Sequence, residues 1–82
     1  MSQNLVEPDM SQVCRSVMIG GQRTSIRMER QFWKGLDEIK REEGLSMQDV
    51  LQLALAKTAE TNRTAAIKTW VLSYYMGSRF VH

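Results

Sequence analysis

The hydrophobic and polar residues of the chain alternate over residues 22–28 and follow a helical period after them. Because strand side chains point in turn to opposite faces, residues 22–28 predict a β-strand with two different sides. The apolar side consists of Thr24, Ile26 and Met28, and the other side consists of Arg23, Ser25 and Arg27. The arginine side has nothing apolar to bury, so we expect it to face solvent or a polar partner.

A second strand is predicted immediately before this one, over residues 13–19. The dipeptide Gly20-Gly21 lies between the two strands and suits a two-residue hairpin turn, which needs positive φ angles. The expected cross-strand pairs are Ile19 with Gln22, Val17 with Thr24, and Arg15 with Ile26. In this register Val13 also joins the apolar side, and Arg15 is its one charged member.

Three helices are expected after the strands, over residues 29–43, 46 to about 61, and 64–76. The first has an apolar stripe at helical spacing, formed by Phe32, Trp33, Leu36 and Ile39. Gly35 lies inside this helix at a cost of about 1 kcal/mol relative to alanine, which suggests close packing against another backbone. Gly44 is expected to end it, and Ser46 to cap the next helix, with Asp49 three residues on.

Length and composition restrict the class of protein. Eighty-two residues allow one domain, expected at residues 13–77 between a flexible polar tail at 1–12 and a short tail at 78–82. The single cysteine, Cys14, and the single histidine, His82, cannot form a disulfide framework or a zinc cluster within one chain. A chain this short without disulfides or a structural metal often relies on dimerisation.

The lone cysteine favours a reducing compartment such as the cytoplasm. No apolar run approaches the roughly 18 residues of a membrane span.

The net charge of +2 is distributed unevenly. Residues 15–34 contain five basic side chains and a single acidic one. This clustering around the predicted strands favours a polyanionic partner. The acidic residues of the first helix have no histidine or other complementary group beside them, and neither a nucleophile–base set nor a phosphate-binding glycine loop is present. We therefore predict a protein that is not an enzyme and needs no metal or cofactor.

Three features occur together in this chain: the alternating strand, Phe32-Trp33-x-x-Leu36 in the first helix, and Gly44-x-Ser46 before the second. Together they resemble the ribbon-helix-helix family of bacterial DNA-binding proteins, relatives of the Arc and methionine repressors. The resemblance covers roughly residues 15–76 and implies an α+β, mostly helical fold that forms an intertwined homodimer. In such a dimer the strands pair across the two-fold axis and both chains share one core, here Thr24, Ile26, Met28, Phe32, Trp33 and Leu36.

The resemblance also implies which residues contact double-stranded DNA. Alternate strand residues enter the major groove, and the matching positions are Arg23, Ser25 and Arg27. The start of the helix after the turn holds a DNA phosphate, and the matching positions are Ser46, Met47 and Gln48. Arg15 and Arg30, from the basic cluster, are expected to contact phosphates as well. Alternatively, residues 46–60 are an insertion, and the phosphate contacts are Arg63, Thr64 and Lys68 at the start of the third helix.

A first strand beside each ribbon strand creates a conflict of size. The dimer would then hold a four-stranded sheet about 20 Å wide at the usual strand spacing of about 4.8 Å. The major groove is only about 12 Å wide. Either residues 13–19 leave the ribbon, or the protein contacts DNA differently from its relatives.

Two function hypotheses follow. The leading one is a homodimeric, sequence-specific DNA-binding protein, a bacterial transcriptional regulator such as a repressor, located in the cytoplasm on the nucleoid. The other is a protein-interaction module, such as an antitoxin, because a fold does not dictate a function. In that case the third helix, expected to end before Gly77, would bind a partner protein through exposed members of Trp70, Tyr74 and Tyr75.

Overall fold

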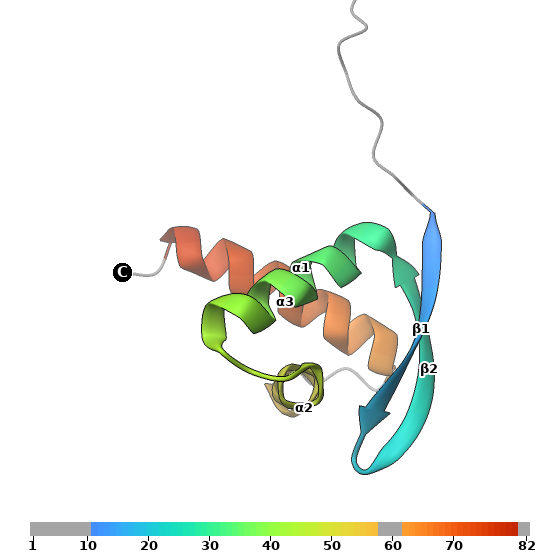
Figure 1. Cartoon of the computed structure of the whole chain (residues 1–82). Coiled ribbons are helices and arrows are strands. Elements are labelled where there is room, and N and C mark those ends of the chain that lie inside the picture. Colours follow the sequence, from blue (N-terminus) through green and yellow to red (C-terminus); the bar gives the residue numbers. More distant parts are fainter. Residues whose placement is uncertain (1–10, 58–61, 81–82) are drawn as a thin grey trace, which may run out of the picture.

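The computed structural model describes residues 11–57 and 62–80 (Figure 1). Its elements are β1 (Gln12–Ile19), β2 (Gln22–Glu29), α1 (Arg30–Glu43), α2 (Met47–Lys57) and α3 (Arg63–Phe80). The two strands form one antiparallel hairpin, and the three helices lie on one side of it (Figure 1). This arrangement confirms the α+β, mostly helical class and the order of a short β segment followed by three helices.

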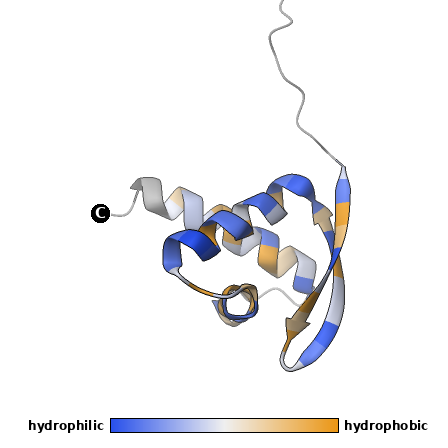
Figure 2. Ribbon diagram, in the orientation of Figure 1, coloured by the Kyte–Doolittle hydropathy of each residue, from blue (hydrophilic) through white to orange (hydrophobic). Residues whose placement is uncertain are grey.

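The hairpin has the predicted register. Ile19 pairs with Gln22, Val17 with Thr24, and Arg15 with Ile26. The turn residues Gly20 and Gly21 have φ angles of 59° and 81°, and two successive positive φ angles are what a type I′ turn requires. Burial alternates with a period of two along much of both strands, and both strands carry hydrophilic and hydrophobic bands (Figure 2). A tight turn and a period of two therefore fix which side chains face the helices.

One side of the hairpin and the inner sides of the helices enclose a hydrophobic core. Its buried members are Val17, Ile19, Ile26, Met28, Trp33, Leu36, Ile39, Val50, Leu51, Ala54, Ile67 and Val71. Both strands and all three helices contribute to this set. A single chain therefore buries an apolar interior of its own.

Helices α1 and α3 approach each other closely at Gly35, as the position of this glycine suggested. A β-carbon at Gly35 would lie 3.2 Å from Cγ1 of Val71 and 3.5 Å from Cε2 of Tyr75. The hydroxyl of Tyr75 donates a hydrogen bond to the carbonyl oxygen of Gly35 at 3.2 Å. The missing side chain thus allows α3 to pack directly on the backbone of α1.

The first helix ends as predicted but begins one residue later. Gly44 has a left-handed φ of 68°, and the N–H of Leu45 donates to the carbonyl oxygen of Lys40 at 3.1 Å. Glu29, expected to begin the helix, has non-helical φ and ψ angles of −58° and 148° and ends β2 instead. Its carboxylate pairs with Lys68 and makes no capping hydrogen bond.

The limits of α3 also differ from the prediction. Helix α3 begins at Arg63 because Oδ1 of Asn62 accepts a hydrogen bond from the N–H of Ala65 at 3.1 Å and caps the helix. It continues through Gly77 to Phe80, since an interior glycine costs only about 1 kcal/mol. Helix α2 ends at Lys57; its expected continuation, like residues 1–10 of the expected tail, lies outside the described residues.

Candidate nucleic-acid interface

The side of the hairpin that faces away from the helices is the candidate site, and we name it the open face. By the observed register it contains Gln12, Cys14, Ser16 and Met18 from β1 and Arg23, Ser25, Arg27 and Glu29 from β2. All of these are exposed except Met18 and Glu29, which are half-buried. The three predicted base-contacting residues therefore lie together on one accessible surface.

The four β1 residues of the open face were not assigned to the site from the sequence. The predicted register contained the information, because residues directly opposite each other in an antiparallel pair share a face. Met18 lies opposite Arg23, Ser16 opposite Ser25, and Cys14 opposite the second arginine. The candidate site is therefore wider than the single strand that the sequence emphasised.

The open face is basic. Two of its eight residues are arginines, and its one acidic residue, Glu29, is paired with Lys68 of α3. Nη1 of Arg23 donates a hydrogen bond across the hairpin to Oγ of Ser16 at 3.3 Å. Because Arg23 and Arg27 face Met18 and Cys14 within the hairpin, no two arginines lie directly opposite each other in it. The like-charge repulsion expected for two identical paired strands is thus avoided inside one chain.

At the end of β2, the charge of Glu29 is neutralised by α3. Nζ of Lys68 lies 2.9 Å from Oε1 of Glu29 and 5.1 Å from the ring centroid of Phe32. The hydrogen bond from Lys68 lowers the pKa of the Glu29 carboxyl below its usual range. The strand that holds both arginines therefore ends without an unpaired negative charge.

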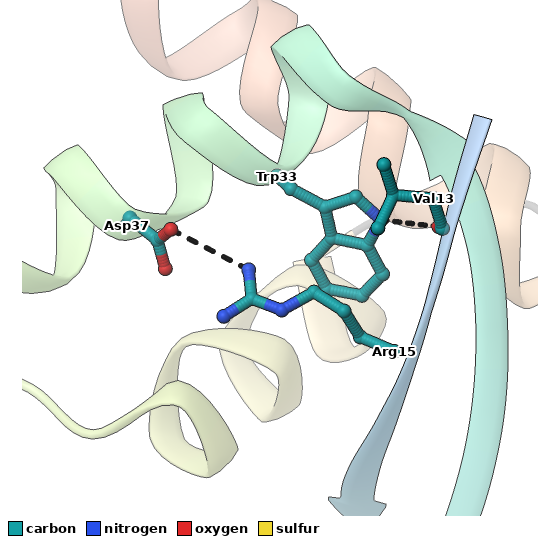
Figure 3. Close-up of polar contacts among 4 residues, drawn as sticks. All are labelled: Val13, Arg15, Trp33 and Asp37. Atoms are coloured by element: carbon teal, nitrogen blue, oxygen red, sulfur yellow. Dashed lines mark hydrogen bonds and ion pairs between the residues drawn. The ribbon is translucent and has the colours of Figure 1, made fainter. Parts of the chain in front are cut away.

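Arg15 lies on the other side of the hairpin, against the helices (Figure 3). Its guanidinium carbon is 4.8 Å from the ring centroid of Trp33, and its Nη1 is 3.4 Å from Oδ2 of Asp37. Nε1 of the same indole donates a hydrogen bond to the carbonyl oxygen of Val13 at 2.8 Å. These contacts explain how a charged residue is accommodated on the apolar side. Arg15 thus points to the side of the hairpin opposite the open face, and its phosphate contact stays a prediction.

The start of α2, the favoured phosphate site, lies beside β1. Oγ of Ser46 accepts a hydrogen bond from the N–H of Asp49 at 3.1 Å, as predicted for a helix cap. Met47 is half-buried and Gln48 is exposed. A surface hollow joins this helix start to β1, and it is lined by Arg15, Ser16, Val17, Met18, Lys40, Met47 and Gln48. The open face and the start of α2 are therefore neighbours.

The start of α3, the alternative phosphate site, has one of its basic side chains already engaged. Arg63 is exposed and Thr64 is half-buried, whereas Lys68 is held in the ion pair with Glu29. Arg30, the first residue of α1, is exposed, and its backbone N–H donates to the carbonyl oxygen of Ser11 at 3.0 Å. The start of α2 is thus the predicted phosphate site that shares a hollow with Ser16 and Met18 of the open face.

A family model described as the ribbon-helix-helix domain matches residues 12–75, from the beginning of β1 into the second half of α3. The chain belongs to the ribbon-helix-helix domain family. This is a non-enzymatic, DNA-binding fold family, and its members generally bind DNA as dimers.

The ribbon-helix-helix fold of this chain is also similar to the solved structure of an uncharacterized protein from Bordetella pertussis Tohama I. The two share 23% sequence identity with a TM-score of 0.71, over 93% of this chain and 65% of that one. This chain thus spans just under two thirds of that protein, and at this identity the likeness concerns the fold alone. No curated protein matches the chain.

The residues expected to form a shared ribbon-helix-helix dimer core are largely covered by the chain itself. Ile26, Met28, Trp33 and Leu36 are buried, whereas Thr24 and Phe32 are half-buried. In this ribbon-helix-helix protein, α2 and α3 of the same chain add Val50, Leu51, Ala54, Ile67 and Val71 to the core that contains these residues. The burial of these side chains therefore does not require a second protomer.

The tyrosines of α3 are engaged with α1 rather than exposed. The hydroxyl of Tyr74 donates to Oε2 of Glu43 at 2.6 Å. The one proton of the Tyr75 hydroxyl is shared between the carbonyl oxygen of Gly35 and Oε1 of Glu38, which lies 3.1 Å away. The hydrogen bond to Glu43 raises the pKa of Tyr74, and burial raises the pKa of Tyr75. Both phenols thus help to hold α3 on the first helix of the ribbon-helix-helix core.

Among residues 63–77 of α3, the large apolar side chains that are exposed are Leu72 and Met76, with 53% and 56% of their surface accessible. They are one helical turn apart and share a face. Trp70 is half-buried, with its ring centroid 5.8 Å from that of Tyr74. A partner protein on this helix would therefore meet an aliphatic surface rather than the aromatic one expected from the sequence.

Within residues 11–57 and 62–80, no three histidine, cysteine or acidic side chains are grouped so that they could hold a metal ion. None of the helices in the described part has both the length and the apolar composition needed to cross a bilayer.

Proposed function

We propose that this ribbon-helix-helix protein is a homodimeric, sequence-specific DNA-binding protein, a bacterial transcriptional regulator that works in the cytoplasm on the nucleoid. The open face is the observation that supports this proposal. It is a basic ribbon of two strands, exposed on one side and fixed to a helical layer on the other. A two-stranded ribbon fits the major groove, and arginine matches guanine edges and phosphates.

Arg23, Ser25 and Arg27 are the proposed base contacts. A guanidinium can donate two hydrogen bonds to O6 and N7 of one guanine, which is worth about 1–3 kcal/mol of discrimination. The backbone N–H groups at the start of α2 would hold a phosphate, because a helix start favours an anion. The hollow that Met47 and Gln48 share with Ser16 and Met18 of β1 supports this proposal. In the homodimer, the half-buried Thr24 and Phe32 would be covered by the second protomer.

The test begins with a DNA duplex that the wild-type protein selects from a pool of random sequences. In anisotropy titrations with that duplex, Arg23→Ala and Arg27→Ala are each expected to weaken binding by about tenfold or more. Arg41→Ala is the matched control, since it removes the same exposed charge from the last turn of α1. Selection of no duplex, or equal affinities for the three variants, would contradict the proposal.

Binding of a partner protein through α3, as in an antitoxin, is the second candidate function. The exposure of Leu72 and Met76 favours it. The salt dependence of DNA binding separates the two functions: contacts with several phosphates give a steep loss of affinity with salt. An absence of DNA binding at low salt, together with a partner that is lost in Leu72→Ser, would support the second function instead.

A further inference from the structure

The open face is shared by two strands of one chain, and this bears on how a ribbon could enter a groove. We infer that the ribbon in the major groove is the β1–β2 hairpin of a single protomer, so that Cys14, Ser16 and Met18 lie against the DNA. This inference rests on the proposed DNA-binding function and adds a second contacting strand to it.

Width is the first argument. Strands β1 and β2 pair with each other along their whole length, so one chain already forms a two-stranded ribbon. Pairing of β2 with β2 of a second protomer would add two more strands and give a sheet of about 20 Å, wider than the groove of about 12 Å. The hairpin alone fits. Strand β1 does not leave the ribbon, since it pairs with β2 along its whole length and is held to α1 by Trp33.

The side chains of β1 suit base edges, which is the second argument. Met18 lies opposite Arg23 and places an apolar, adaptable side chain next to a guanidinium. An apolar side chain in the major groove contacts the methyl group of thymine, while the adjacent arginine binds guanine. The hairpin therefore presents two kinds of base contact side by side.

Ser16 is a positioning residue in this arrangement. Its Oγ accepts one hydrogen bond from Nη1 of Arg23 at 3.3 Å. Arginine has five N–H donors, so the others remain for a guanine or a phosphate. By restricting the guanidinium to one side of the ribbon, Ser16 would determine which base Arg23 reaches.

The first experiment uses the native chain, in which Cys14 is the only cysteine and is exposed. The rate of alkylation of Cys14 by iodoacetamide is measured with and without a saturating amount of the selected duplex. We expect the duplex to slow the reaction at least tenfold. A double variant, Cys14→Ser with Ser73→Cys, moves the thiol to an exposed position on α3 and should show no protection. An unchanged rate for Cys14 in the bound complex would overturn the inference.

The second experiment measures base preference, which a merely structural role would not change. Ser16→Ala and Met18→Gln are used to select duplexes from the random pool, with Ser73→Ala as the matched control. We expect each β1 variant to change the preferred base at one position and the control to select the wild-type sequence. Ser16→Ala removes only an exposed hydroxyl and should fold like the wild type. This variant therefore tests the inference even if Met18→Gln is unstable.

The outcomes also separate this inference from the proposed function. If Arg23→Ala loses the selected duplex while Cys14 is unprotected and the β1 variants keep the wild-type preference, the DNA-binding function stands and the single-chain ribbon is wrong. If the wild-type protein selects no duplex, both are wrong.

Discussion

Nε1 of Trp33 donates a hydrogen bond to the carbonyl oxygen of Val13 at 2.8 Å, so the first turn of α1 holds the beginning of β1 (Figure 3). The indole is buried, with 3% of its surface accessible, and Arg15 stacks on its face. One side chain therefore connects the hairpin to the helical layer by a hydrogen bond, by apolar burial and by a cation–π contact.

Replacing Trp33 with phenylalanine keeps an aromatic ring but removes the donor and part of the volume. We expect Trp33→Phe to lower the free energy of unfolding by about 1–3 kcal/mol, measured by urea denaturation. Trp70→Phe is the control, because Trp70 is only half-buried. If the two variants are equally stable, the contact between Trp33 and Val13 contributes nothing measurable.

The pair of Glu29 and Lys68 predicts a dependence of stability on pH. Because the folded protein has a lowered Glu29 pKa, the stabilisation is fully present above the ordinary value of 4.5 and is lost as the pH falls through the lowered value. In urea titrations between about pH 6 and pH 3, Glu29→Gln should lose less stability than the wild type. Lys68→Met should reduce the loss in the same way. If both variants show the same pH dependence of the unfolding free energy as the wild type, the ion pair does not contribute to it.

A side chain at Gly35 is expected to clash with α3. Gly35→Ala gains up to about 1 kcal/mol of helix propensity, but its β-carbon would lie 3.2 Å from Cγ1 of the buried Val71. Val71 is β-branched and cannot turn away easily, so we expect a net loss of about 1 kcal/mol in the free energy of unfolding. A double-mutant cycle with Val71→Ala tests the cause. In that background Gly35→Ala should be neutral or stabilising, and an equal loss in both backgrounds would refute the clash.

The hairpin turn predicts a different effect for alanine than for asparagine. Gly20 and Gly21 have positive φ angles and nothing within 4 Å of an added β-carbon, so only the backbone conformation opposes a side chain there. Gly20→Ala should lower the unfolding free energy by about 1–2 kcal/mol. Gly20→Asn should be close to neutral, since Asn-Gly is a preferred type I′ pair. Thermal unfolding of the two variants compares them directly, and equal stabilities would argue against the left-handed turn.

Local chemistry accounts for the parts of the fold that the sequence predicts well. The glycine pair and the period of two predict the register of the hairpin, Gly44 ends α1, and Ser46 caps α2. Each of these depends on residues that are close in sequence. The register in turn places Arg23 and Arg27 on one exposed side, which is why the candidate site could be located at all.

The parts that could not be predicted depend on contacts between distant segments. Arg15 appears as an error in an apolar pattern until Trp33 and Asp37 are placed beside it. The sequence did not show that Tyr74 would bind the carboxylates of α1, nor that Gly77 would stay helical. The cover that α3 gives to the core explains why burial within one chain was not expected from the family resemblance.

The separation of the two sides of the hairpin has a consequence for divergence within the family. The exposed residues of the open face take no part in enclosing the core, so under the proposed function substitutions there would alter the recognised DNA sequence with little effect on folding. A change in length is different. One residue inserted at Gly20-Gly21 would turn Val17 and Ile19 outwards and their polar neighbours inwards. Relatives are therefore expected to acquire new targets by point substitution, while the number of residues between the strands stays constant.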